Sequence, residues 1–239
     1  MTGYAHGVHD LGHGCTAWLL PPGGWGQSNS GLVRGAGQSL LVDTHLDVAH
    51  TAEMLDGTAS LRADHPVRSV VNTHADGDHW FGNQLVAGPE VEIVASEAAA
   101  ASMTQATVEE LSSLWQLEGA VGDYVRRYAG RFDPSGITAA PPTRTFAGEL
   151  ELDVGGRPVR LLQVGPAHTP GDVLVHVPDA GVVFTGDILF IGSAPLVWQG
   201  PVSRCIAACD AVLDLEPDTV CRATDRSPTG EACWTSATT

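Results

Sequence analysis

The residues best suited to chemistry are histidines and aspartates that gather in one short stretch and return at two later points. The stretch THADGDH contains four of them, and GPAHTPGD and FTGD contribute one candidate ligand each. The six residues are His74, Asp76, Asp78, His79, His168 and Asp187. Imidazole and carboxylate are the ligands that zinc and related divalent ions take in catalytic sites. We therefore predict a metal centre built from these residues.

The spacing of the first four residues fits a site at the end of a strand. Alternate residues of an extended turn point to one side, which groups His74, Asp76 and Asp78, while His79 begins the next helix. For any one of these aspartates alone, a place in a turn or at a helix N-cap is the favoured explanation. That simpler explanation does not account for six ligand-type residues at three strand ends.

Apolar strands lead toward each part of the cluster. The predicted strand at 67–72 leads into THADGDH, and the strand at 159–164 leads into GPAHTPGD. The strand at 181–187 ends in FTGD. Turns of this kind gather at one rim of a sheet, where functional residues tend to lie.

The remaining elements complete two similar halves. Other predicted strands lie at 14–20, 39–43, 91–95 and 218–222, and two hairpins join 149–154 to 159–164 and 173–177 to 181–187. Predicted helices cover 45–63, most of 96–131, and 202–215. Two half-sheets, each flanked by helices, predict an α/β (α+β) fold arranged as a four-layer αββα sandwich.

The polar turns also resemble the motifs of a known family. THADGDHWFGN, GPAHTPGD and FTGD are similar to the metallo-β-lactamase superfamily, whose hallmark is H-x-H-x-D-H, then a His, an Asp, and a last His in a P-G-H-G turn. The resemblance covers residues 12–220. Within the superfamily, the THADGDH turn and the FDPSGI and PPTRTF stretches resemble an actinobacterial group that includes cyclases and thioesterases of aromatic polyketide pathways.

The resemblance implies a role for each candidate ligand. It makes His74 and His168 ligands of a first metal and Asp78 and His79 ligands of a second, with Asp187 between the two. It also gives Asp78 a catalytic role, which is to orient the nucleophile or handle its proton. Asp76 stands where the family has its second histidine, and an aspartate makes the site harder and more anionic. We expect one or two Zn²⁺ ions, with iron or manganese as alternatives.

The end of the chain departs from the family. Thr224 occupies the place of the last histidine ligand. All 12 basic residues are Arg, which suggests that the gene is GC-rich. When the chain from Cys221 is back-translated with GC-leaning codons and read one base earlier, the result can encode the family's P-G-H-G turn. We therefore hypothesise one domain over 1–220 and an out-of-frame tail over 221–239. Resequencing the 3′ end of the gene decides this; the alternative is a divergent tail with Asp225 as a substitute ligand.

The implied activity is hydrolysis of a thioester, ester or lactone, and the narrower resemblance favours a cyclase or thioesterase of aromatic polyketide biosynthesis. Two alternatives stay open: a degenerate, non-catalytic member that binds a metabolite or a pathway partner, and a general hydrolase of the lactonase or glyoxalase type. The chain contains no G-x-S-x-G elbow, Walker loop or G-x-G-x-x-G after a strand.

Aromatic residues near the ligands are candidates for the walls of a substrate site. Trp25, Trp80, Phe190 and Trp198 suit a flat acyl group, which we expect as a small molecule or bound to a carrier protein. A basic patch at Arg126, Arg127 and Arg131 suits a phosphopantetheine phosphate or an acidic carrier, but a solvated helix face is the favoured explanation.

Composition limits the partners. The 239 residues carry 28 acidic and 12 basic side chains and a formal charge of −16, which disfavours nucleic acid and anionic membrane surfaces. The N-terminal residues lack the basic and apolar regions of a signal peptide, and no apolar run approaches the ~20 residues of a membrane span. We therefore expect a cytoplasmic protein; the sequence does not fix an oligomeric state.

Overall fold

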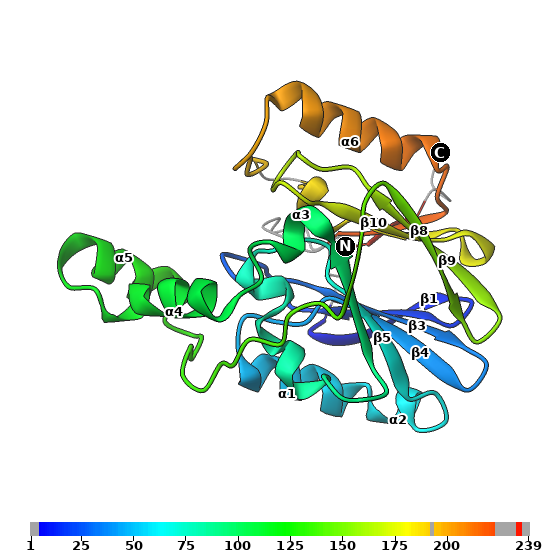
Figure 1. Ribbon diagram of the computed structural model, residues 1–239, viewed down its shortest axis with the longest axis horizontal. Helices are drawn as coiled ribbons and strands as arrows, with labels where there is room; N and C mark the ends of the chain where they lie inside the picture. The colour runs from blue at the N-terminus through cyan, green and yellow to red at the C-terminus, as the bar shows by residue number, and fades with distance from the viewer. Residues whose placement is uncertain (1–4, 192–193, 223–232, 236–239) are drawn as a thin grey trace.

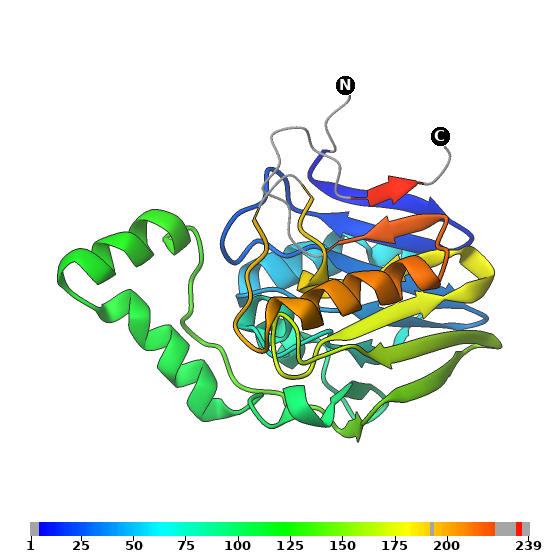
Figure 2. The same cartoon turned by 90° about the horizontal axis from the view of Figure 1, so that it is seen from above.

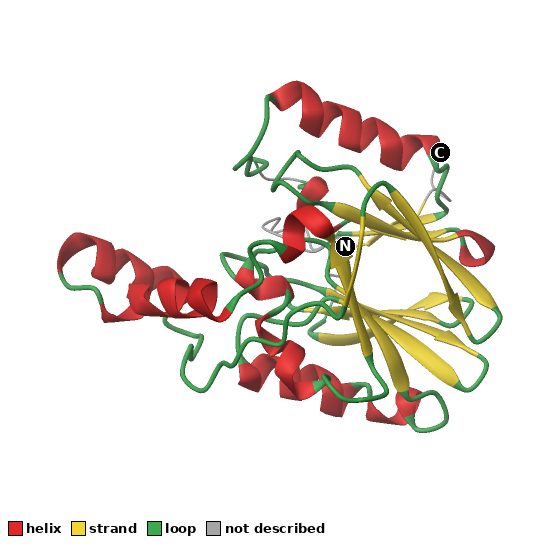
Figure 3. Cartoon of the chain, viewed as in Figure 1, coloured by secondary structure: helices red, strands yellow, loops and turns green. Residues whose placement is uncertain are grey.

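Two β-sheets lie face to face in the computed structural model, with helices on both outer surfaces (Figures 1 and 3). The structure describes residues 5–191, 194–222 and 233–235. The expected four-layer αββα arrangement is confirmed.

The first sheet is formed by the N-terminal half of the chain. In the described residues its strands are β1 (Gly7–Gly12), β2 (Cys15–Leu19), β3 (Ser30–Gly35), β4 (Gln38–Val42), β5 (Val67–Val71), β6 (Glu92–Ser96) and β7 (Arg144–Phe146), in that spatial order. The first four strands pair antiparallel, and β4 to β7 pair parallel. β2 is buried along its whole length, which explains its continuous apolar sequence.

The second sheet is formed by the C-terminal half. Its described strands are β8 (Glu149–Val154), β9 (Arg157–Gln163), β10 (Val173–Val177), β11 (Val182–Phe184), β12 (Thr219–Cys221) and β13 (Cys233–Thr235), and their spatial order is β13-β12-β11-β10-β9-β8. The two predicted hairpins are present as β8–β9 and β10–β11. Buried residues alternate with less buried ones in β8, because one face of this strand packs between the sheets.

Helices and 3-10 turns connect the strands. The α-helices are α1 (Val48–Gly57), α2 (Ala59–Arg62), α3 (Glu97–Ala100), α4 (Gln105–Ser113), α5 (Gly119–Ala129) and α6 (Val202–Asp214). The 3-10 turns are η1 (Gly77–His79), η2 (Phe81–Leu85), η3 (Leu114–Gln116), η4 (Pro178–Ala180) and η5 (Gly186–Ile188). Two of these turns, η1 and η5, carry predicted ligands.

Separate apolar clusters hold the layers together. Val33, Val175 and Phe184 belong to the central cluster between the sheets. Met54 of α1 packs on the outer face of the first sheet, and Val212 of α6 packs on the outer face of the second. Burial of such side chains contributes about 1.5–3 kcal/mol each.

A helical arm formed by α4, η3 and α5 (residues 105–129) projects from the side of the sandwich in both views (Figures 1 and 2). Val108, Val125 and Ala129 on its inner side share an apolar cluster with Trp80 and Phe81. This packing connects the arm to the turn that carries the predicted ligands.

Several elements differ from the sequence-based expectation. The helix expected over 45–63 is divided into α1 and α2 at Thr58, and β1, β3 and β7 were not anticipated. β12 runs through Cys221 and pairs with β13, which lies inside the proposed aberrant tail. Thr224 and Asp225 lie outside the described residues. Within the part of the chain that is described, no helix has the length and apolar character needed to cross a bilayer.

Candidate metal centre

The predicted ligands come from three chain segments that meet at one rim of the two sheets. His74, Asp76, Asp78 and His79 follow β5, His168 lies between β9 and β10, and Asp187 follows β11. A backbone hydrogen bond of 2.8 Å from Val173 N to Thr73 O joins the two sheets at this rim. The structure thus brings together side chains that are more than 100 residues apart.

The ligand atoms converge closely. His168 Nε2 lies 3.2 Å from Asp76 Oδ2, and His74 Nε2 lies 3.9 Å from the same oxygen. Asp187 lies between two imidazoles, since its Oδ2 is 3.6 Å from His168 Nε2 and its Oδ1 is 3.7 Å from His79 Nε2. Asp78 Oδ2 is 3.8 Å from His79 Nε2.

Two overlapping sets of ligand atoms result, and in each set the atoms lie within 4.8 Å of one another. One set contains His74, Asp76 and His168, and the other contains His74, His79 and Asp187. Asp78 belongs to neither set, although it lies at the edge of the second. Spacings of this size suit atoms arranged around a small cation.

Each histidine is held by its other ring nitrogen. His74 Nδ1 lies 3.0 Å from Thr73 Oγ1. His79 Nδ1 lies 2.8 Å from Asp43 Oδ2, and His168 Nδ1 lies 2.8 Å from the Leu196 carbonyl oxygen. Partners on Nδ1 fix the orientation of each ring and leave Nε2 as the ligand atom, which is the usual arrangement around protein metals. All three Nε2 atoms face the centre of the site.

Asp43 organises two of these contacts and was not anticipated from the sequence. Its Oδ1 accepts from Thr73 N at 2.7 Å, and its Oδ2 accepts from Thr73 Oγ1 at 2.7 Å as well as facing His79. The side chain is buried, and the residue has a φ of 61°, in the left-handed region that aspartate tolerates better than most residues. Its position directly after the apolar run SLLV was the signal in the sequence.

The turn that carries His168 is built around a second buried aspartate. Asp172 accepts hydrogen bonds from Thr169 N, Thr169 Oγ1 and Ala167 N at 2.6–3.2 Å. On the other side, Ser96 Oγ donates to the Gly171 carbonyl oxygen at 2.6 Å. These bonds explain why GPAHTPGD forms a fixed loop rather than a mobile one.

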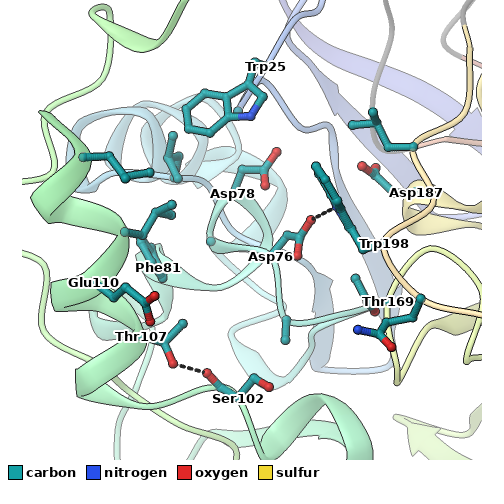
Figure 4. Close-up of a pocket in the computed structure, with 18 of the residues that line it drawn as sticks. Trp25, Asp76, Asp78, Phe81, Ser102, Thr107, Glu110, Thr169, Asp187 and Trp198 are labelled. Carbon is teal, nitrogen blue, oxygen red and sulfur yellow. Dashed lines mark hydrogen bonds between the residues drawn. The ribbon is translucent and has the colours of Figure 1, made fainter. Parts of the chain in front are cut away.

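Trp198 contacts the aspartate that departs from the family pattern. Its indole Nε1 donates to Asp76 Oδ2 at 3.2 Å, and its backbone N donates to the His168 carbonyl oxygen at 2.9 Å (Figure 4). Residues 196–198 therefore orient both His168 and Asp76.

Charge is concentrated in this buried space. The carboxylates of Asp78, Asp43 and Asp187 outweigh the effect of burial and raise the pKa of His79 to about 10. The pKa of His168 rises to about 9 in the same way, through Asp76 and Asp187, against the effect of burial. Burial raises the pKa of the Asp187 carboxyl to about 6. Without a metal, protons on His79 and His168 offset part of the charge of the clustered carboxylates.

The donor set fits a divalent cation. Across the described residues, the buried Nε2 atoms of His74 and His79 have no hydrogen-bond partner. A buried nitrogen without a partner is costly, and a bound cation removes that cost. Imidazole and carboxylate together suit zinc, iron or manganese.

The ligands form part of the wall of a cavity of about 590 Å³ (Figure 4). Asp76, Asp78 and Asp187 face into it, and Ser28 Oγ holds the Asp78 turn by donating to the Asp78 carbonyl oxygen. Trp25, Phe190 and Trp198 line the cavity, as the sequence led us to expect.

Trp80 is the exception among the predicted wall residues. It is 0% exposed, packs edge-to-face with Phe81 at 5.0 Å between ring centroids, and does not line the cavity. Its Nε1 donates to the Ala75 carbonyl oxygen at 2.9 Å. Trp80 therefore supports the ligand turn from the core instead of facing a substrate.

Comparison with known proteins agrees with this geometry. The family model described as the metallo-beta-lactamase superfamily matches residues 23–223. The chain belongs to the metallo-beta-lactamase superfamily. A solved structure, a metallo-beta-lactamase from Pontibacter korlensis, is similar with a TM-score of 0.66 and 19% sequence identity. The alignment covers 92% of this chain and 93% of the chain of that structure, which shows that the two share a fold.

Two curated proteins are also similar. The acyl-coenzyme A thioesterase MBLAC2 of Bos taurus is 26% identical over 201 residues, which is 79% of this chain and 68% of the relative. The hydroxyacylglutathione hydrolase of Brucella ovis is 33% identical over 76 residues, which is 32% of this chain and 29% of the relative. The chain is thus grouped with superfamily hydrolases.

Proposed function

We propose that this chain is a metal-dependent hydrolase that cleaves thioester, ester or lactone bonds, with thioesters as the preferred class. The observation that carries the proposal is the convergence of three imidazole Nε2 atoms with the carboxylates of Asp76 and Asp187, and both of these carboxylates line a largely apolar cavity. The thioesterase name of the MBLAC2 relative supports the choice of bond.

In the proposed mechanism His74, Asp76 and His168 would hold one metal, and His79 and Asp78 would hold a second; the Asp187 carboxylate, which faces both His168 and His79, would complete the donor set. A divalent metal bound there would lower the pKa of a water molecule and polarise the carbonyl group of the substrate. The chain's own contribution is orientation, since Thr73, Asp43 and the Leu196 carbonyl oxygen fix the imidazole rings. Asp78 faces the cavity and takes the proton of the attacking water, then returns it to the departing thiolate or alkoxide.

The cavity walls support an apolar acyl group. Trp25, Phe190 and Trp198 offer aromatic faces, and Leu111 and Leu114 add aliphatic surface. This lining is also compatible with the flat acyl chains of an aromatic polyketide cyclase or thioesterase, which we retain as the narrower proposal.

A non-catalytic role remains the second candidate, because an aspartate replaces one histidine at Asp76 and a threonine stands at Thr224. The two functions differ in metal content and turnover. We expect the purified protein, after reconstitution with Zn²⁺, to contain between one and two metal ions by mass spectrometry and to hydrolyse acyl-thioesters faster than lactones or β-lactams. Absence of bound metal together with absence of turnover favours the binding protein.

A further inference from the structure

The charged side chains that line the cavity all have the same sign. Among the lining residues that the structure describes, Asp76, Asp78, Asp187 and Glu110 are charged, and no arginine or histidine is present. Three of these carboxylates belong to the metal centre, where a bound cation offsets them. Glu110 does not belong to it, so its charge is left to act on whatever enters the cavity.

Glu110 lies on the wall that the helical arm provides. It belongs to α4, next to Leu111 and near Thr107, and Figure 4 shows it across the cavity from Trp198 and Thr169. It is solvent-exposed, and none of the ion pairs within 4 Å in the described residues involves it. A substrate that spans the cavity from the metal centre therefore meets this carboxylate.

Arg126 of the arm and Arg131, which follows the arm, are directed elsewhere. Arg131 Nη1 donates to Gln27 Oε1 at 2.5 Å, and Arg126 Nη2 donates to Asp123 Oδ1 at 2.8 Å. Neither residue lines the cavity. The polar lining that remains near Glu110 consists of the hydroxyl groups of Thr107 and Ser102, which accept and donate hydrogen bonds without adding charge.

We infer that the cavity selects acyl groups that carry no negative charge, and that Glu110 is the specificity-determining residue for this choice. The inference rests on the proposed function and names its substrate class: thioesters with an uncharged, apolar acyl chain. A carboxylate at the far end of the acyl chain is repelled by Glu110, and no cation in the cavity lining compensates for it. Repulsion between like charges in a partly solvated cavity corresponds to a preference of about tenfold or more in kcat/KM for the uncharged acyl group over the charged one.

The test compares two thioesters of N-acetylcysteamine that differ only in charge, hexanoyl and adipoyl, with the metal-loaded protein. We expect kcat/KM for the hexanoyl thioester to exceed that for the adipoyl thioester by about tenfold, and the ratio to shrink as salt screens the repulsion. Glu110→Gln lowers the ratio at least about threefold, and Glu110→Asp restores it. Glu109→Gln removes the same charge from the same helix outside the cavity lining and leaves the ratio as in the parent protein.

A binding measurement separates this inference from the proposed activity. The S-hexyl and S-carboxypentyl thioethers of N-acetylcysteamine cannot be hydrolysed, and their binding is followed by tryptophan fluorescence. If neither thioester is cleaved but the S-hexyl compound binds more tightly in a Glu110-dependent way, the proposed activity fails and the selectivity stands. Equal handling of the charged and neutral compounds, or a ratio that Glu110→Gln does not change, overturns the inference.

Discussion

At the scale of single residues, Asp43 holds two of the metal-centre histidines in place. It contacts His79 directly and reaches His74 through Thr73, whose hydroxyl donates to Asp43 and so accepts from the His74 ring. One buried carboxylate therefore sets the orientation of two imidazoles. Outer partners of this kind contribute to metal affinity without touching the metal.

We expect Asp43→Asn to weaken metal binding about 10- to 100-fold, because the amide has one accepting oxygen where the carboxylate uses two, so its NH2 group must face either Thr73 N or the side chains of Thr73 and His79. Asparagine tolerates the left-handed backbone of this position, so the change removes the charge without adding backbone strain. Competition with a chromogenic chelator measures the affinity. Asp10→Asn, at an exposed position, is the matched control; an affinity equal to that of the control contradicts the role given to Asp43.

Metal binding should also release protons. With pKa values of about 10 and about 9, the metal-free His79 and His168 are both protonated at pH 7.5, and a metal ion must displace these protons. Calorimetry in buffers of different ionisation enthalpy should therefore show release of about two protons at pH 7.5. The release should fall toward zero above pH 10, and metal affinity should weaken as the pH is lowered.

The sequence indicated the candidate ligands but not the residues that support them. Histidines and aspartates at strand ends are visible as types and spacings, whereas Asp43 is one aspartate after an ordinary strand, 30 residues from its partner Thr73. Trp80 was assigned to the cavity wall because it adjoins a ligand. The direction of its side chain depends on packing against Phe81, which the sequence does not specify.

At the scale of elements, short turns at the strand ends aim the ligands. Gly186 precedes Asp187 in η5, has a φ of 54°, and approaches Thr73 so closely that an added Cβ would lie 2.7 Å from Thr73 Oγ1. The position therefore requires glycine both for its backbone and for its space. Thr73 in turn contacts His74, so this close approach connects the η5 turn to the first ligand segment.

We expect Gly186→Ala to destabilise the protein and to weaken metal binding, because the new methyl group displaces Thr73. Gly148→Ala is the control: Gly148 also has a positive φ of 74°, but an added Cβ there meets nothing within 4 Å. The control should lose about 1–2 kcal/mol of unfolding free energy from backbone strain alone and keep its metal affinity. Equal effects of the two substitutions in urea unfolding and metal titration would contradict this account.

Element prediction succeeded where periodicity was strong and failed where strands were short. The hairpins of the second sheet follow from alternating or continuous apolar runs around Gly155-Gly156 and Pro178-Asp179. β3 begins in a run of small polar residues, and β7 has only three residues, so neither carries a clear period-two pattern. β3 is stabilised by pairing with β2 and β4 on either side of it, and β7 by pairing with β6, from which the helical arm separates it in the sequence.

At the scale of the whole molecule, the candidate metal centre lies where the two sheets meet, so metal binding there would affect the stability of the entire sandwich. Its ligands come from both halves of the chain, and crowded carboxylates repel one another when no cation is present. A ligand that binds only the folded state stabilises it by mass action. Metal content and thermal stability should therefore change together.

We expect removal of metal with a chelator to lower the melting temperature, and added Zn²⁺ to restore it. At a free metal concentration a thousand times the Kd the stabilisation is about 4 kcal/mol. Differential scanning calorimetry measures the shift. His168→Ala removes a ligand of the first proposed metal and should reduce the chelator effect on the melting temperature; an undiminished effect in this variant would place that metal elsewhere.

The helical arm has a consequence for how this protein can change over evolutionary time. The ligands are distributed over strand ends throughout the chain, but the wall that carries Glu110, Leu111 and Leu114 is one continuous stretch inserted between β6 and β7. Under the proposed function, the groups that cleave the bond and the residue that selects the acyl group would thus be inherited on separate segments. Substitutions in the insert could then alter what the protein accepts while the candidate metal centre is passed on intact.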